Sequence, residues 1–117
     1  MAKKRILSIS YDEPLLITRQ MLLAKAGYSV TSAAGFAEAI ERCRSGKYDL
    51  ILMGHSMAQK DKRALIATLR QNSQAPLVSI RRHGEAPIPE AACSVVSHDG
   101  PGALIEGIKS VLASPKT

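Results

Sequence analysis

The residue types needed for nucleophilic catalysis occur side by side at one place in the chain, where His55 is followed directly by Ser56. Asp12 and Asp99 could complete a Ser/His/Asp arrangement, and His55 alone could accept a phosphoryl group. However, no GxSxG-type elbow surrounds Ser56, and sequence order alone does not bring these side chains within hydrogen-bonding distance. We therefore predict no catalytic residue and no enzymatic activity, and we expect His55 to be a partly buried loop histidine.

Sequence motifs for nucleotides, metals and disulfides are also missing. No GxGxxG or Walker-type loop follows the first apolar run, which begins at Ile6. Cys43 and Cys93 have no CxxC pattern or Cys/His cluster around them, which favours two buried free thiols over a disulfide or a zinc site. The sequence thus predicts neither a cofactor nor a metal ion.

The chain is basic, with 16 Lys and Arg against 10 Asp and Glu and a formal charge of +6. Such a balance favours contact with an acidic partner, nucleic acid or an anionic surface. The basic residues are spread over several short clusters, so we favour a solvated basic surface over nucleic-acid binding. No signal peptide and no apolar run of membrane-spanning length is found, which predicts a cytoplasmic protein without membrane contact. The main clusters are Lys3 to Arg5, Lys60 with Lys62 and Arg63, and Arg81 with Arg82.

Apolar runs suited to strands alternate along the chain with segments of helical periodicity. The alternation predicts an α/β fold, doubly wound, with a five-stranded parallel sheet in the flavodoxin-like order 2-1-3-4-5. One domain is expected over residues 1–117, with its core at about 4–113. Strands are expected at Ile6 to Ser10, Tyr28 to Ser32, Tyr48 to Met53, Ala75 to Ile80 and Cys93 to Val96. Helices are expected from Leu15 to the stop at Gly27, from Phe36 to Ser45, from Lys62 to Gln71, and after Pro101.

The segment between the last two predicted strands does not fit this alternation. Pro87 and Pro89 lie with one residue between them, and no apolar stripe of helical period runs from His83 to Ala92. Proline inside a helix costs about 3 kcal/mol or more and disfavours helix in the residue before it. The helix expected here is therefore predicted to be shortened or missing, with at most one turn.

Four short stretches follow one another at spacings that are found together in one family. They are Arg5-Ile6-Leu7 leading into Asp12-Glu13-Pro14-Leu15-Leu16, then Ala26-Gly27-Tyr28, Tyr48-Asp49-Leu50-Ile51-Leu52, and Asp99-Gly100-Pro101. From Lys4 to Leu112 the chain resembles the CheY-like receiver domain of bacterial response regulators. The resemblance implies a role in two-component phosphorelay signalling.

The resemblance also implies where a phosphorylation site would lie. In the family, two acidic residues after the first strand and an aspartate after the third bind Mg²⁺ and accept a phosphoryl group. A hydroxyl residue after the fourth strand and a lysine after the fifth assist them. None of the five is present, because the matching positions hold Ser10, Tyr11, Gly54, Arg81 and Ser97. A shift of one residue would bring Tyr11 and Asp12 to the acidic pair but would leave the central ligand missing, so we expect no Mg²⁺.

The five replacements also reverse the charge of this region. Three carboxylates and one lysine carry −2, whereas the residues found here carry +1, all of it on Arg81. We expect Arg81 beside Gly54, either filling the space of the missing carboxylates or binding an anion or a partner's carboxylate. In the first case it would pair with Asp12 or Asp99, and Tyr11 would pack over the same place. The residues expected in the crevice are Asp12, His55, His98 and Asp99.

Together these features predict a pseudo-receiver, a signalling module that binds a protein partner or a second copy of itself without aspartyl phosphorylation. A homodimer is one form that this assembly could take. Two alternatives remain open at this stage. The net charge leaves a small basic nucleic-acid-binding protein, and the crevice at the carboxyl edge of the sheet leaves an enzyme.

Overall fold

The computed structural model describes residues 3–113 and contains one five-stranded sheet with helices on both of its faces. The strands are β1 (Arg5–Ser10), β2 (Ser29–Ala34), β3 (Leu50–Met53), β4 (Leu77–Arg81) and β5 (Cys93–Val96). The helices are α1 (Glu13–Lys25), α2 (Phe36–Ser45), α3 (Gln59–Leu69) and α4 (Gly100–Ala113), and a short 3-10 turn covers Ser97–Asp99. No helix in this part of the chain is long and apolar enough to cross a membrane.

All neighbouring strands are parallel, and their order is β2-β1-β3-β4-β5. Ile9 of β1 stands opposite Ala33 of β2 on one side and Met53 of β3 on the other. The carboxyl ends of β1 and β3 therefore meet at the same edge of the sheet, where doubly wound folds form their crevice. The predicted fold class and strand order are confirmed.

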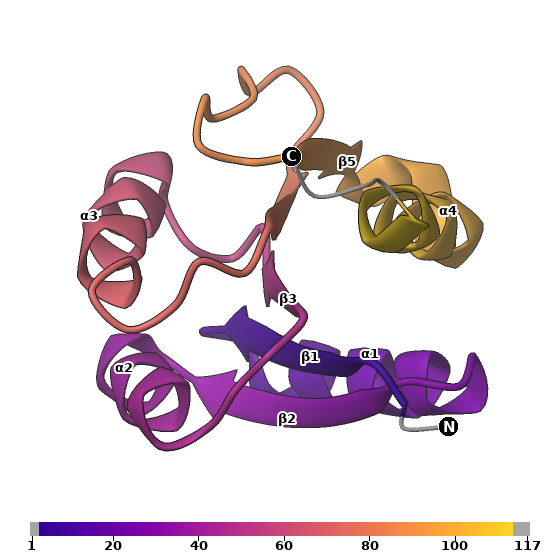
Figure 1. Ribbon diagram of the computed structural model, residues 1–117. Helices are drawn as coiled ribbons and strands as arrows, with labels where there is room; N and C mark the ends of the chain where they lie inside the picture. The colour runs from indigo at the N-terminus through magenta and orange to yellow at the C-terminus, as the bar shows by residue number, and fades with distance from the viewer. Residues whose placement is uncertain (1–2, 114–117) are drawn as a thin grey trace.

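The helices form two layers, with α1 and α4 on one face of the sheet and α2 and α3 on the other (Figure 1). Side chains alternate along each strand, so Leu52 of β3 packs in the cluster under α1 and α4, while Met53 packs in the cluster under α2 and α3. In β4 the same alternation sends Leu77 toward α2 and α3 and Ile80 toward α1 and α4. Both faces are buried, which explains the continuous apolar run of β3.

Helix α1 begins at Glu13, two residues before the start expected from the apolar pattern, and Asp12 is its N-cap. The Asp12 carboxylate accepts a hydrogen bond from the backbone N–H of Leu15, with 3.1 Å between the nitrogen and Oδ1. Pro14 lies in the first turn, where its missing N–H costs nothing. Past the end of α1, Gly27 has φ of 102°, a left-handed conformation that glycine adopts without strain.

The connection between β4 and β5 contains no helix, as the two prolines predict. It is nonetheless attached to the rest of the molecule. Ile88, between the prolines, is buried in the cluster under α2 and α3, and Glu90 pairs with Arg63 of α3 at 3.0 Å. The Gln59 side chain also donates to the backbone carbonyl of Ala86. These contacts hold the proline-rich segment against α3.

Cys43 and Cys93 are both free thiols; Cys43 is buried, whereas Cys93 is only partly buried and so differs from the two buried thiols that the sequence predicts.

Candidate functional site

The carboxyl edge of β1 and β3 carries small neutral side chains at the positions for which the resemblance implies carboxylates. Gly54 follows β3 and donates its backbone N–H to the Ile9 carbonyl at 2.9 Å. The Ser10 hydroxyl, at the end of β1, lies 2.8 Å from the Ser56 hydroxyl and accepts from the backbone N–H of Asp12 at 3.0 Å. The Tyr11 N–H in turn donates to Ser56 Oγ at 3.1 Å. These hydroxyl groups hold the loops together and offer no formal negative charge.

The cation at this place is Arg19 of α1. A Cβ built on Gly54 would lie only 2.7 Å from Arg19 Nη1, closer than such contacts occur in proteins. The Arg19 side chain is 7% exposed, and its Nη1 has no hydrogen-bond partner. Burial lowers the pKa of this guanidinium, and the nearby Asp12 carboxylate raises it in part. Arg19 therefore occupies the space into which a side chain at position 54 would extend.

The prediction that Arg81 fills this space is wrong. Its Nη1 donates to the Glu85 carbonyl at 2.5 Å, so the side chain is used to close its own loop and does not pair with Asp12 or Asp99. The reason is the alternation of β4, in which residue 81 shares the face of Leu77, toward α2 and α3. Arg19 reaches Gly54 from α1, on the opposite face of the sheet.

A second buried cation, Lys62 of α3, lies near the end of β4. The side chain is 1% exposed, and its Nζ donates to Ser79 Oγ at 3.0 Å and to the Ile80 carbonyl at 2.6 Å. Burial lowers the pKa of Lys62 from 10.5 to about 8, against the opposing effect of the Glu85 charge. The expected surface cluster of Lys60, Lys62 and Arg63 is thus wrong for Lys62, which lies in the core.

His55 is partly buried, as expected, and its hydrogen bond goes to Arg19. Arg19 Nη2 lies 3.1 Å from His55 Nδ1, an arrangement in which the neutral ring accepts and carries its proton on Nε2. Ser56 bonds instead to Ser10 and Tyr11, so the structure does not assemble a Ser/His/Asp triad from His55 and Ser56. Burial lowers the pKa of His55, and the charges of Arg19, Arg82 and Lys62 lower it further.

We predict that His55 titrates below its ordinary pKa of 6.5, because protonation would place a second cation against Arg19. The pKa is lower in the folded than in the unfolded state, so stability should fall as the pH drops below 6.5. NMR titration of the imidazole signals checks the midpoint. Arg19→Met should raise it toward the ordinary value, and the control Arg63→Met should leave it unchanged. A midpoint at or above 6.5 in the unaltered protein would contradict the prediction.

The remaining predicted crevice residues are dispersed. Tyr11 is 45% exposed and its ring lies beside Gly35, so it does not cover Gly54 as expected. Ser97, His98 and Asp99 form the exposed turn before α4. The His98 ring lies 6.4 Å from that of His83, centre to centre.

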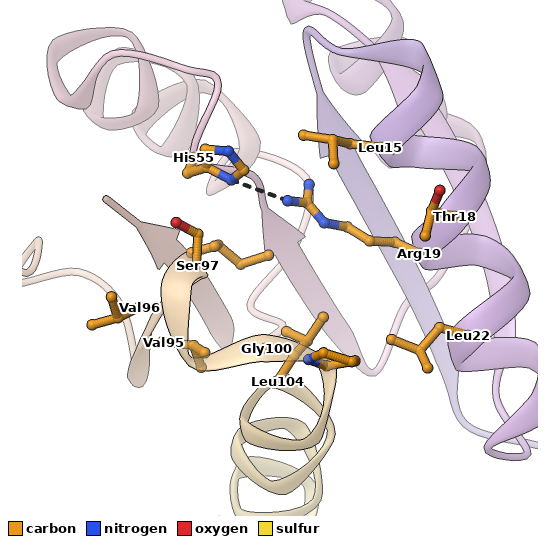
Figure 2. Close-up of a pocket in the computed structure, with 12 residues that line it drawn as sticks. Leu15, Thr18, Arg19, Leu22, His55, Val95, Val96, Ser97, Gly100 and Leu104 are labelled. Carbon is orange, nitrogen blue, oxygen red and sulfur yellow. Dashed lines mark hydrogen bonds between the residues drawn. The ribbon is translucent and has the colours of Figure 1, made fainter. Parts of the chain in front are cut away.

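A cavity of about 220 Å³ opens beside Arg19, between α1 and α4. Figure 2 shows Arg19 and His55 meeting at one end of it, with Leu22 and Leu104 farther from this pair. Ser97, Gly100 and Pro101 bring the start of α4 to its wall. The cavity is apolar except near Arg19, His55, Thr18 and Ser97.

The residues at the carboxyl edge do not fit the Mg²⁺ that the receiver family binds. Magnesium prefers carboxylate oxygens, but Ser10 and Gly54 supply none and the Asp12 carboxylate caps α1. The Arg19 guanidinium beside Gly54 would repel a divalent cation. Within residues 3–113, no three His, Cys, Asp or Glu side chains gather into a metal-binding group.

Solved structures with the same fold include CheY-like receiver domains. The receiver domain protein from Methanospirillum hungatei JF-1 has a TM-score of 0.81 at 21% identity, over 95% of this chain and 94% of that one. The receiver protein from Sinorhizobium medicae WSM419 has a TM-score of 0.79 at 22% identity, over 96% of each chain. A third structure is the N-terminal domain of a response regulator/sensory box/GGDEF 3-domain protein from Carboxydothermus hydrogenoformans. It has a TM-score of 0.79 at 27% identity, over 93% of this chain and 94% of that one.

The fold is therefore that of the CheY-like receiver domains, which supports the resemblance found in the sequence. No protein-family model and no curated protein matches the chain.

Sequence reasoning missed both buried cations, although a signal for each was present. Arg19 lies between Leu16 and Leu23 in the buried stripe of α1, and Lys62 precedes Leu65 in that of α3. A charged residue at such a position usually extends toward solvent, so its presence in the stripe does not by itself predict burial.

Proposed function

We propose that this chain is a pseudo-receiver, a signalling module of the two-component type that works without aspartyl phosphorylation. The observation that carries the proposal is the Arg19 guanidinium held beside Gly54. A receiver is switched when an aspartate here gains a phosphoryl group. Glycine has no atom that can accept one, and Arg19 takes up the space instead.

The mode of action that this leaves is binding, to a protein partner or to a second copy of the chain, in the cytoplasm. The receiver fold supports it, because receivers signal through contacts with other proteins. The family's surface between the fourth and fifth strands is altered here, since residues 82–92 form no helix and are held against α3. The contacts are therefore expected to differ from those of a phosphorylated receiver.

Acetyl phosphate with Mg²⁺ should leave the mass of the protein unchanged, and beryllofluoride with Mg²⁺ should leave its melting temperature unchanged. Both reagents act on the aspartate carboxylate that Gly54 replaces. Intact-mass spectrometry and thermal denaturation check the two results, with a receiver that keeps its three carboxylates as the positive control. A gain of one phosphoryl group mapping to the loop after β3 would contradict the proposal. So would retention of generic duplex DNA that persists at raised salt, which would favour nucleic-acid binding.

A further inference from the structure

Arg19 is a buried cation with no ion pair closer than 4.0 Å among residues 3–113, although the Asp12 carboxylate acts on it from farther away. Its recorded hydrogen bond goes to a neutral histidine ring, and Nη1 has no partner. Among residues 3–113, Arg63 and Glu90 form an ion pair with less than 4.0 Å between the charged groups, and Arg19 takes no part in it. Buried charges in proteins are normally paired, because an unpaired charge loses its hydration without compensation. An anion bound beside Arg19 would supply the missing partner.

The cavity between α1 and α4 is the place from which an anion could reach Arg19. No acidic side chain lines it, and the start of α4 at Gly100 contributes the positive end of a helix of 14 residues. His55 lies at the same end of the cavity, with its Nδ1 already bonded to Arg19. One end of the cavity is thus suited to a negative group.

The rest of the cavity is suited to an apolar group. Leu15, Leu22, Ile80, Val95 and Leu104 line it, and these side chains cannot hydrogen-bond a ligand. A cavity of roughly 150 Å³ with such walls is large enough for benzene. At about 220 Å³ the present one has room for a ring together with a small head group.

We propose that this cavity binds a small organic carboxylate, with its head group on the Arg19 guanidinium and its apolar body between α1 and α4. A carboxylate matches the fork of a guanidinium and can be held by two parallel hydrogen bonds. Inorganic phosphate satisfies the same cation but leaves the apolar walls uncovered, so it should bind less well. The proposal goes beyond the pseudo-receiver function and does not depend on it, since phosphorylation chemistry plays no part in it.

Benzoate is the probe, and benzamide is its neutral counterpart of nearly the same shape. In titrations followed by ¹⁵N NMR, benzoate should shift the signals of α1, His55 and the start of α4 and should raise the melting temperature. Benzamide should bind at least about tenfold more weakly, because the charge-assisted bond to Arg19 is lost. Inorganic phosphate should also be weaker than benzoate. Equal binding of benzoate and benzamide, or of benzoate and phosphate, would overturn the proposal.

Arg19→Met tests the guanidinium directly, with Arg63→Met as a control that removes an exposed arginine from α3. Benzoate binding should fall at least about tenfold in Arg19→Met and should be retained in Arg63→Met. Unchanged binding in Arg19→Met, or signals that shift mainly outside α1, His55 and α4, would refute the site. If Arg19→Met fails to fold, the comparison of benzoate with benzamide on the unaltered protein decides the question.

Discussion

Gly54→Asp is expected to be more stable than Gly54→Asn by about 2 kcal/mol at neutral pH. The two side chains have nearly the same shape, and both must displace Arg19 Nη1, which lies 2.7 Å from the position of the new Cβ. They differ in charge, and only aspartate gives Arg19 a counter-ion. The guanidinium has already lost its hydration in the unaltered protein, so pairing requires the desolvation of one further group instead of two. Urea denaturation of the two variants gives the difference directly.

Removal of the guanidinium should reverse this order. In an Arg19→Met background, a buried aspartate has lost its principal partner, so Gly54→Asp should become less stable than Gly54→Asn. The advantage of aspartate in the original background should also disappear at low pH. Pairing with Arg19 lowers the pKa of the new carboxyl in the folded protein. The ion pair therefore stabilises the fold above the pKa of aspartate in the unfolded chain, about 4, and this stabilisation is lost as the pH falls below that value. If Gly54→Asp and Gly54→Asn were equally stable both with Arg19 and with Arg19→Met, Arg19 would not act on position 54.

Most of the fold could be predicted from the sequence because strands and helices differ in their apolar period. The limits of the elements were less accurate where that signal fades. Helix α3 begins at Gln59, three residues before the predicted start, because its first turn is polar and lacks apolar residues. Strand β2 continues to Ala34, since the small residues after Val30 pair with β1 as far as Ser10. Pairing with a neighbouring strand cannot be deduced from local composition.

The sequence predicts Arg81 beside Gly54, but the side chain that the structure places there is Arg19. Arg81 is the last residue of β4, so its backbone position can be deduced from the sequence, but the face on which its side chain lies depends on the alternation along the strand. Alternation along β4 puts it with Leu77, whereas Arg19 approaches Gly54 from α1. The contact between residues 19 and 54 depends on the packing of a helix across the sheet. Such a distant contact is not coded in any short stretch of sequence.

Raising the pH from 8 to 10.5 is expected to stabilise the protein through Lys62 by roughly 3 kcal/mol. The buried ammonium has its pKa lowered from 10.5 to about 8, so between these values the unfolded chain binds a proton that the folded chain does not. Stability must then rise with pH across this window. Below pH 8 both states are protonated, and the cost of burying the charge is present in full.

Two variants in α3 isolate this effect from that of other groups. Lys62→Met keeps an apolar chain of similar length in the core and should lose the rise in stability, whereas Lys60→Met, at an exposed position, should retain it. The comparison also removes the opposing contribution of Tyr11, whose raised pKa makes stability fall at high pH in all three proteins. Urea midpoints measured between pH 7.5 and pH 10 give the three curves. A Lys62→Met curve parallel to that of the unaltered protein would show that Lys62 titrates normally and that its ammonium is hydrated in the folded state.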